Sequence, residues 1–378
     1  MFKRRKYHMT PYEEKLNRIN KAVALEPVDK VPFIPCGTSI YAKIEGVKLG
    51  DYIKDMDLNY KVNLGALEKI GGVDGIQNMV FDPKLLATSW LSEVKVPGVH
   101  LSDNELWQIH EQELIKQEDY DDILKKGFFR WYLGFMRKKL DNPMQYAPRY
   151  FWKIRKARKP FMKAGYVCIG GPGFGSPFEM FCGGRSMESF LIDDLMEIPD
   201  KVDEVFKKVH TVNKTLYKLQ LKMLKPYGAW IGGWRGTPGI VNKEMFERFS
   251  WQYMKDLALM LLSKNVVPIF HLDSDWERGL EYFRELPKGR CIMALDGNTN
   301  IHKAKEVVGD MMCIMGDVPA EMLAFGTPDK VYDYSMNLIR TMGPTGFILS
   351  SGCDIPFNAK LENVQMMGKA CLDAAKNK

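Results

Sequence analysis

Short apolar runs alternate along the chain with longer amphipathic segments. The first run, residues 31–35, is bounded by prolines, as expected of a buried strand. Seven more runs of this kind follow at residues 75–81, 166–170, 229–232, 266–272, 291–295, 312–318 and 346–350. Apolar residues recur with helical spacing at residues 10–24, 49–70, 120–140, 186–224, 243–263, 275–286, 301–308, 328–342 and 361–375. The pattern predicts eight strands, each followed by a helix.

This alternation favours one architecture. Parallel strands need crossover connections, and a sheet covered by helices must be buried on both faces. Eight such units in 378 residues fit a closed (β/α)8 (TIM) barrel better than an open doubly wound sheet. No internal repeat and no linker rich in proline, glycine and serine divides the chain. We therefore predict an α/β protein in which residues 1–378 form a single barrel domain.

Two segments depart from a plain barrel. Residues 94–101 and 106–111, joined by the polar turn Ser102-Asp103-Asn104, predict a β-hairpin inserted after the second strand. The helical pattern of residues 120–163 is longer than one barrel helix needs. We expect these insertions to form a cap, from about residue 90 to residue 163, over the barrel mouth where catalytic groups concentrate in this architecture.

Composition and charge limit the classes of function. With 46% hydrophobic residues the chain can bury a large core. The net charge of +7 comes largely from Lys3 to Lys6 and from residues 138–163, while the remainder is nearly balanced. A solvated helix face explains such a basic stretch better than a docking surface for an acidic partner, and no nucleic-acid binding is expected.

The cysteines and the first residues point to the cytoplasm. Seven cysteines, an odd number without CxxC pairs, make a disulfide framework improbable, so we expect reduced thiols. No apolar run is long enough to cross a membrane, and the first residues lack the apolar stretch of a signal peptide. We therefore expect a cytoplasmic protein without membrane contact.

Candidate metal ligands follow the fifth and eighth predicted strands. His271 and Asp273 are two residues apart and hence lie on the same side of an extended strand, and Cys353 follows the eighth strand. Imidazole, carboxylate and thiolate converging at the barrel mouth would make a three-ligand zinc site with one open position. Mixed nitrogen, oxygen and sulfur donors suit zinc, whereas magnesium and calcium prefer oxygen alone.

The residues alone leave a structural alternative open. His271 could be a hydrogen-bonded polar residue, Asp273 a helix cap, and Cys353 a packing residue. Cys291 and Cys313 lie inside apolar strands and are expected to be core thiols, although Cys313, on the strand beside Cys353, could replace one of the ligands.

Other polar and aromatic groups follow neighbouring strands. The sixth strand is followed by Asp296 and the seventh ends at Asp317. The fourth strand carries Trp230, Trp234 and Arg235, which suit an aromatic or carboxylated ligand, although the indoles could equally fill space under the cap. The glycine-rich passage at residues 175–185 is interpreted as a turn that approaches the substrate, because it lacks any phosphate-binding motif.

The C-terminal half resembles the uroporphyrinogen decarboxylase superfamily. The resemblance is carried by HLDSDWERGLEYFREL, ALDGNTNIHKAKEVVGD, CIMGDVPAEMLAFGTPDKV and GFILSSGCDIPFNAKLENV. It covers roughly residues 165–370, and the N-terminal part more loosely through EPVDKVPFIP. The superfamily implies a (β/α)8 barrel and two principal activities, which are cofactor-free decarboxylation of uroporphyrinogen and zinc-dependent methyl transfer involving a corrinoid.

Two motifs distinguish between these activities. Decarboxylases carry Arg-Gln-Ala-Gly-Arg-Tyr after the first strand, where this chain has Cys36-Gly37-Thr38-Ser39-Ile40-Tyr41. Corrinoid methyltransferases carry His-x-Cys at the fifth strand and a cysteine after small residues at the eighth. This chain has His271-Leu272-Asp273 and Ser351-Gly352-Cys353, so Asp273 departs from the family's cysteine. The carboxylate keeps an anionic ligand but makes the metal harder and more Lewis acidic.

The resemblance therefore implies an O-demethylase-type methyltransferase. Zinc on His271, Asp273 and Cys353 would bind a small-molecule methyl donor, and Asp317 or Asp296 would supply a proton or orient a ligand. Trp230, Trp234 and Tyr41 would suit an aromatic ring. The chain lacks the cobalamin-binding pattern DxHxxG, so the corrinoid (cobalamin) would arrive on a separate protein.

Two alternatives remain. A decarboxylase would need basic residues at the mouth, for which Arg185, Arg235 and Lys43 are the candidates. A barrel that only binds a tetrapyrrole or a corrinoid protein is the second. The methyl donor, the direction of transfer and the oligomeric state, for which a homodimer is one hypothesis, do not follow from the sequence.

Overall fold

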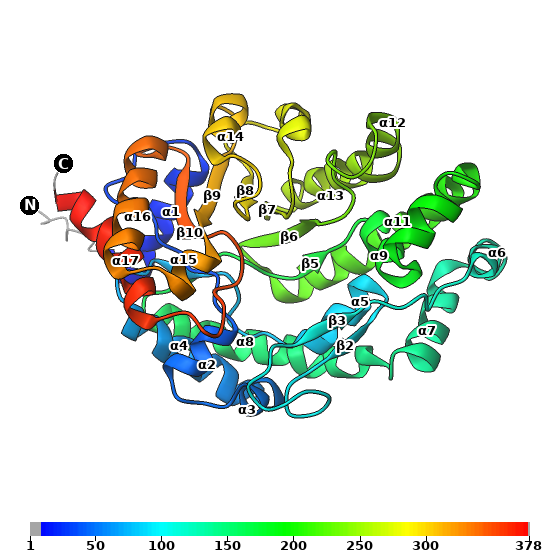
Figure 1. Cartoon of the computed structure of the whole chain (residues 1–378), viewed down its shortest axis with the longest axis horizontal. Helices are drawn as coiled ribbons and strands as arrows, with labels where there is room; N and C mark the ends of the chain where they lie inside the picture. The colour runs from blue at the N-terminus through cyan, green and yellow to red at the C-terminus, as the bar shows by residue number, and fades with distance from the viewer. Residues whose placement is uncertain (1–8, 377–378) are drawn as a thin grey trace, which may run out of the picture.

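Parallel strands form the centre of the molecule (Figure 1). The computed structural model describes residues 9–376, so the basic residues Lys3 to Lys6 lie outside the described part. Six strands pair in the order β10-β9-β8-β7-β6-β5, and β1 pairs separately with β4, all in parallel. Their bounds are β1 Gly75–Ile76, β4 Val167–Cys168, β5 Gly173–Phe174, β6 Gly228–Gly233, β7 Val267–Leu272, β8 Ile292–Leu295, β9 Cys313–Val318 and β10 Phe347–Ser351.

Backbone hydrogen bonds outside these strands complete the ring. Phe33 forms a parallel bridge with Leu349 of β10, and its carbonyl accepts from the N–H of Asp74, next to β1. The segment from β4 to β5 pairs with β1 at its start, and the Pro172 carbonyl near its end accepts from Trp230 of β6. The eight predicted strand segments thus run around a (β/α)8 barrel, as the alternation predicted.

Two apolar layers hold the barrel together. Alternate strand residues such as Ile269, Ile292 and Met315 pack inside the ring, where Ile19 and Val23 of α1 (Pro11–Val23) join them. The residues between them pack outward beneath the helices. This two-sided burial explains why the strands read as continuous apolar runs.

Most predicted helices are present. Those around the barrel are α2 Ser39–Ile44, α3 Leu49–Lys54, α4 Met56–Ile70, α9 Pro177–Arg185, α11 Pro199–Leu224, α12 Lys243–Met245, α13 Gln252–Leu262, α14 Ile301–Val308, α15 Ala320–Phe325, α16 Pro328–Met342 and α17 Leu361–Lys376. The predicted helix 49–70 is divided at Asp55, whose side chain accepts from Asp57 N–H and caps α4. Residues Glu277–Glu285 form a 3-10 helix.

The predicted hairpin is confirmed, with shorter strands than expected. β2 (Glu93–Lys95) and β3 (Gln108–His110) pair antiparallel, and a loop longer than the predicted turn joins them. The helices that follow are α6 Gln117–Lys126, α7 Phe128–Lys139 and α8 Ala147–Lys163, and α5 (Ala87–Trp90) precedes the hairpin. Figure 1 shows α6 and α7 beside α9 and α11, at the end of the molecule away from α16 and α17. The boundaries of a cap at about residues 90–163, and the single-domain division, stay predictions.

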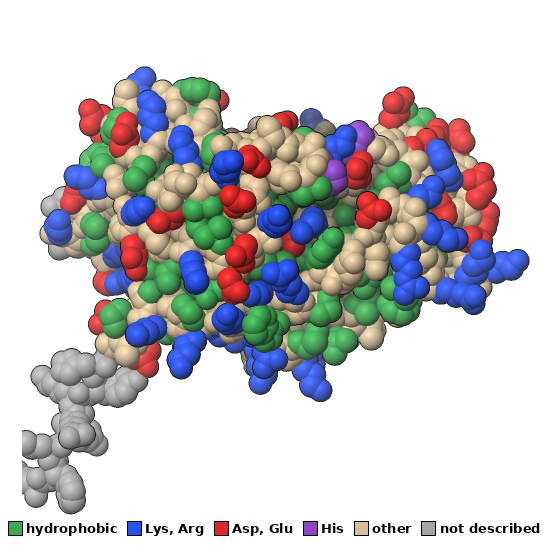
Figure 2. Space-filling view, turned by 90° about the horizontal axis from the view of Figure 1, so that it is seen from below, with side chains coloured by type: hydrophobic (Ala, Val, Ile, Leu, Met, Phe, Trp, Pro, Cys, Tyr) green, Lys and Arg blue, Asp and Glu red, His purple; other side chains and the backbone are tan. Residues whose placement is uncertain are grey.

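The cysteines are reduced, as the sequence predicted. All seven cysteines are free thiols. Within residues 9–376, no helix has both the length and the apolar character needed to span a bilayer. Figure 2 shows Lys and Arg side chains interspersed with acidic and apolar ones on the lower face. A cytoplasmic location and a homodimer stay predictions.

Candidate functional site

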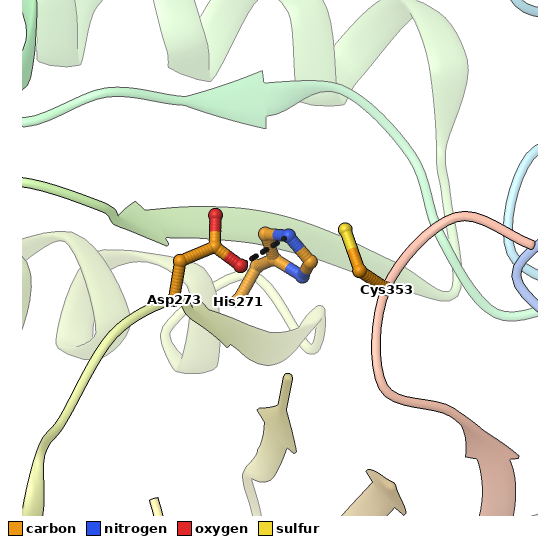
Figure 3. Close-up of side chains that lie close together, drawn as sticks. All are labelled: His271, Asp273 and Cys353. Atoms are coloured by element: carbon orange, nitrogen blue, oxygen red, sulfur yellow. Dashed lines mark ion pairs between the residues drawn. The ribbon is translucent and has the colours of Figure 1, made fainter. Parts of the chain in front are cut away.

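His271, Asp273 and Cys353 converge at the mouth of the barrel (Figure 3). One ligand atom from each residue lies within 4.8 Å of the ligand atoms of the other two. The Nε2 atom of His271 is 3.4 Å from Oδ1 of Asp273. The structure therefore brings together the three side chains that the sequence singled out on two different strands.

Strand β7 places the side chain of His271 on the inner side of the barrel. Ile269 of this strand belongs to the interior cluster, and His271, two residues further on, lies on the same side. Its neighbours in register are Gly232 of β6, which has no side chain, and Ala294 of β8, which has only a methyl group, so they leave room for an imidazole. The ring of Trp230 meets the imidazole edge to face, with 5.8 Å between ring centroids.

The backbone around Asp273 is held by its neighbours. The N–H of Asp273 donates to the Gly233 carbonyl over 3.0 Å, and its own carbonyl accepts from Nε1 of the fully buried Trp276 over 2.9 Å. The next residue, Ser274, donates its N–H to Oδ2 of Asp296 over 3.0 Å. Asp296 therefore positions the loop that carries Asp273.

A tight turn places Cys353. A Cβ atom on Gly352 would lie 2.4 Å from the carbonyl oxygen of Asp296, so only glycine allows the end of β10 to approach the end of β8 this closely. On the other side of the cysteine, the carboxylate of Asp354 accepts from Thr38 N–H over 2.7 Å and from its hydroxyl over 2.6 Å. Cys353 is thus fixed between two anchored neighbours.

Substituting Gly352 tests this placement. In Gly352→Ala the added methyl group must push the turn away from Asp296, which moves the Cys353 sulfur. We expect zinc affinity, measured by competition with a chelator, to fall by about 10- to 100-fold, the usual effect of changing a group that orients a metal ligand. Gly134→Ala in α7, where an added Cβ atom would meet no other atom within 4 Å, is the control. Equal zinc affinities in the two variants would contradict the role given to Gly352.

Desolvation and nearby carboxylates raise the pKa of both acidic residues of the triad. Burial raises the pKa of Asp273, and the nearby Asp296 adds to the rise, whereas His271 opposes it. The pKa of the Cys353 thiol is raised to about 12, first by desolvation and then by the charges of Asp273, Asp354 and Asp296. A bound cation would stabilise the ionised forms of both ligands.

The donor set fits zinc. Bond lengths of about 2.1 Å to nitrogen or oxygen and 2.3 Å to sulfur, at tetrahedral angles, place neighbouring donors roughly 3.4–3.6 Å apart. The separation of His271 and Asp273 already matches this edge at 3.4 Å. The sulfur of Cys353 would have to move only a short distance towards the other two donor atoms, because it already lies within 4.8 Å of both.

Asp317 and Asp296 differ in their surroundings. Asp317, the residue of β9 that follows the interior Met315 by two positions, is buried and accepts a hydrogen bond from the hydroxyl of Tyr334 over 2.9 Å. Burial raises its pKa, which favours the protonated carboxyl. Both oxygens of Asp296 accept hydrogen bonds, from Ser274 and Asn298, so its visible task is to position loops.

Aromatic rings lie next to the triad. The indole of Trp234 covers Gly232, the register neighbour of His271, because a Cβ atom on that glycine would lie 2.4 Å from the ring. Trp90 meets Trp234 with 4.7 Å between ring centroids. Within the described residues, the buried indole N–H groups of Trp90 and Trp230 have no hydrogen-bond partner. The rings of this wall are suited to contact a planar ligand.

Arg235 is engaged by the protein itself. Its guanidinium donates to Glu111 over 2.7 Å and to the Cys182 carbonyl over 3.3 Å. Its backbone, with those of Trp234 and Gly236, donates to the buried carboxylate of Glu179. Binding of a substrate carboxylate by Arg235 would require it to leave Glu111, so its assignment as a substrate-binding residue stays a prediction.

Tyr41 does not reach the mouth. Its side chain is fully buried in α2, and its hydroxyl donates to the Pro35 carbonyl over 3.3 Å. We propose no substrate contact for it. Cys291 and Cys313 are fully buried among core residues, as expected, and neither belongs to the metal-ligand group found among the described residues.

Sequence reasoning missed Glu179, Trp90 and Tyr334. The passage at residues 175–185 is not a turn but the buried helix α9, which begins with Pro177 after the N-cap Ser176. The signal was present as Ser176-Pro177-Phe178-Glu179, a typical helix start. Gly183 serves packing, because a Cβ atom there would lie 2.1 Å from the Trp90 carbonyl oxygen.

Comparison with known proteins agrees with this fold. The sequence profile of the family described as Uroporphyrinogen decarboxylase (URO-D) matches residues 163–373, more than half of the chain. Among solved structures, a methyltransferase from Methanosarcina mazei is similar with a TM-score of 0.73 and 17% sequence identity, covering 97% of this chain and 99% of the other. At this identity the likeness concerns the fold alone. No curated protein matches the sequence.

Proposed function

Because the chain belongs to the uroporphyrinogen decarboxylase (URO-D) family and carries a nitrogen, oxygen and sulfur donor set at its barrel mouth, we propose that it is a zinc-dependent methyltransferase. It transfers a methyl group from a methoxylated, aromatic donor to the cobalt of a corrinoid carried by a separate protein. The observation that carries this proposal is the convergence of His271, Asp273 and Cys353 from two strands that are far apart in the sequence.

The chain's own groups have distinct tasks in this reaction. His271, Asp273 and Cys353 would hold the metal, which would supply a Lewis acid for the oxygen of the methyl donor. Trp90, Trp230 and Trp234 hold the aromatic ring beside the triad and exclude water. Asp317, whose pKa is raised by burial and whose carboxyl group accepts a hydrogen bond from Tyr334, supplies a proton to the demethylated product.

Decarboxylation of a polycarboxylated tetrapyrrole has less support. The three basic residues that it would need are engaged elsewhere. Arg185 pairs with Asp194 and Glu113, Arg235 with Glu111, and Lys43 donates to the Ala359 carbonyl. None of them offers an uncommitted cation for substrate carboxylates.

Metal removal with a defined methyl acceptor tests the proposal. Purified protein is incubated with free cob(I)alamin and, separately, a methoxylated aromatic acid, a methylamine and a methyl thioether, and methylcobalamin is followed by its absorption. We expect turnover with the methoxylated aromatic acid, a loss of at least about 100-fold after chelation, and recovery on adding zinc.

Three outcomes would contradict the proposal. Equal rates in metal-free and zinc-loaded protein would exclude the metal's role. Metal-independent conversion of uroporphyrinogen would favour the decarboxylase. Cobalamin binding without methyl transfer from any donor would favour a barrel that only binds.

A further inference from the structure

A cavity lies against the outer side of the barrel wall. It has a volume of about 340 Å³, at the small end of the range of ligand pockets, and lies between α1, α8, β4 and the segment that joins α11 to β6. Its wall is largely aromatic and apolar, with the four tyrosines Tyr12, Tyr150, Tyr166 and Tyr227.

This cavity is separate from the triad. Val167 and Ile169 face the interior of the barrel, whereas Cys168, between them, faces the cavity on the opposite side of the strand. His271 and Asp273 follow the interior side of β7. The wall of the barrel therefore stands between the two sites, and neither His271 nor Cys353 lines the cavity.

An unpaired guanidinium lies in the cavity wall. One nitrogen of Arg158 donates to the carbonyls of Leu224 over 2.6 Å and Lys225 over 3.0 Å. These are its only hydrogen bonds among residues 9–376, and no carboxylate of that part of the chain pairs with it. Its remaining N–H groups are free for a planar anion, which a guanidinium can bind through two parallel hydrogen bonds.

The surroundings add positive charge. An adjoining hollow of about 600 Å³ shares Lys225 and Pro226 with the cavity and is also lined by Lys218, Lys222 and Lys264. Within the described residues, none of these four lysines forms an ion pair. By contrast, Lys207 and Lys214 of α11, the helix that carries Lys218 and Lys222, are paired with carboxylates. Uncompensated cations around an apolar cavity attract an anion with an apolar body.

We propose that this cavity binds a small aromatic carboxylate, with its ring among the tyrosines and its carboxylate on Arg158. The neighbouring lysines raise the local concentration of the anion. A polyphosphate would fit the lysine-lined hollow but would leave the aromatic cavity unused, so the lining favours a single carboxylate on a ring. The site does not depend on the proposed methyl transfer.

Binding of a charged ligand and its neutral counterpart tests the site. The full chain is titrated calorimetrically with 1-naphthoate and with 1-naphthalenemethanol, which has a similar ring and no charge. We expect naphthoate to bind more tightly. Arg158→Gln should weaken the binding of naphthoate by about tenfold or more, as expected for a lost charged hydrogen bond. The same variant should change the affinity for the neutral compound by less than about threefold.

Variants elsewhere decide where the ligand sits. Ile154→Phe fills the cavity and should abolish naphthoate binding, whereas Ile192→Phe, the same change at an exposed position, should leave it intact. Arg235→Gln, at the barrel mouth, should have no effect on it. Thermal unfolding confirms that each variant is folded. No naphthoate binding, equal binding to Arg158→Gln, or a loss caused by Arg235→Gln would overturn the proposal, whatever the outcome of the methyl-transfer assay.

Discussion

Replacing His271 by alanine is expected to reduce bound zinc from about one ion per chain to a small fraction of that value. The change removes one of three protein ligands, and the remaining carboxylate and thiol repel each other when both are ionised. Zinc affinity should fall by more than about 100-fold, beyond the effect of changing a group that only orients a ligand. Elemental analysis after dialysis measures the zinc content.

The matched control for this variant is His302→Ala. His302 is an exposed histidine of α14 and is not part of the triad. It should retain the zinc content of the unchanged protein, and both variants should keep their helical circular dichroism. Full zinc content in His271→Ala would show that the metal site is elsewhere or absent, and the proposed chemistry would lose its basis.

Removing Arg185 is expected to give the largest loss of stability. Its side chain is 3% exposed and donates through two nitrogens to Asp194, whose side chain is fully buried. In Arg185→Ala the hydrogen bonds left to that carboxylate within residues 9–376 are those from Gln117 and Tyr120. Leaving a buried charge without its partner costs about 3–5 kcal/mol. The free energy of unfolding in urea measures this loss.

The control for Arg185 is an arginine with an exposed partner. Arg284 pairs with Asp310 over 2.7 Å, and the two side chains are 39% and 57% exposed. Arg284→Ala should therefore cost no more than about 1 kcal/mol. If both variants lost similar free energy, the buried network that joins α9 to α6 would not have the role that we assign to it.

The barrel could be predicted from the sequence because strand burial leaves a direct pattern. Apolar runs such as residues 266–272 and 312–318 match β7 and β9 to within one residue. The run at residues 31–35 was predicted as the first strand, and Phe33 does pair with Leu349, but as an isolated bridge whose partner at the far end of the chain no local pattern identifies. The break at Asp55 was missed because a helix cap inside an amphipathic segment leaves the apolar spacing unchanged.

The candidate site was predictable only in part. His271 and Asp273 share a strand, so their spacing alone places them on one side. Cys353 was singled out because it follows the eighth predicted strand of a barrel, and the resemblance then supported it, since no local rule relates the end of β10 to the end of β7. Tyr41, which we expected beside the substrate, is fully buried, because a residue that follows a strand can turn into the core. Glu179 has no signal of its own, because its role depends on backbone N–H groups of a distant turn.

The order in which the metal donors appear along the chain has a consequence for how the protein matures. His271 and Asp273 belong to the fifth barrel strand, but Cys353 follows the last one, whose pairing with Phe33 joins the two ends of the ring. A chain still lacking that last segment offers zinc two donors instead of three. If the triad binds zinc as proposed, we expect stable zinc uptake to be a late event in biogenesis and a product truncated before Cys353 to remain metal-poor.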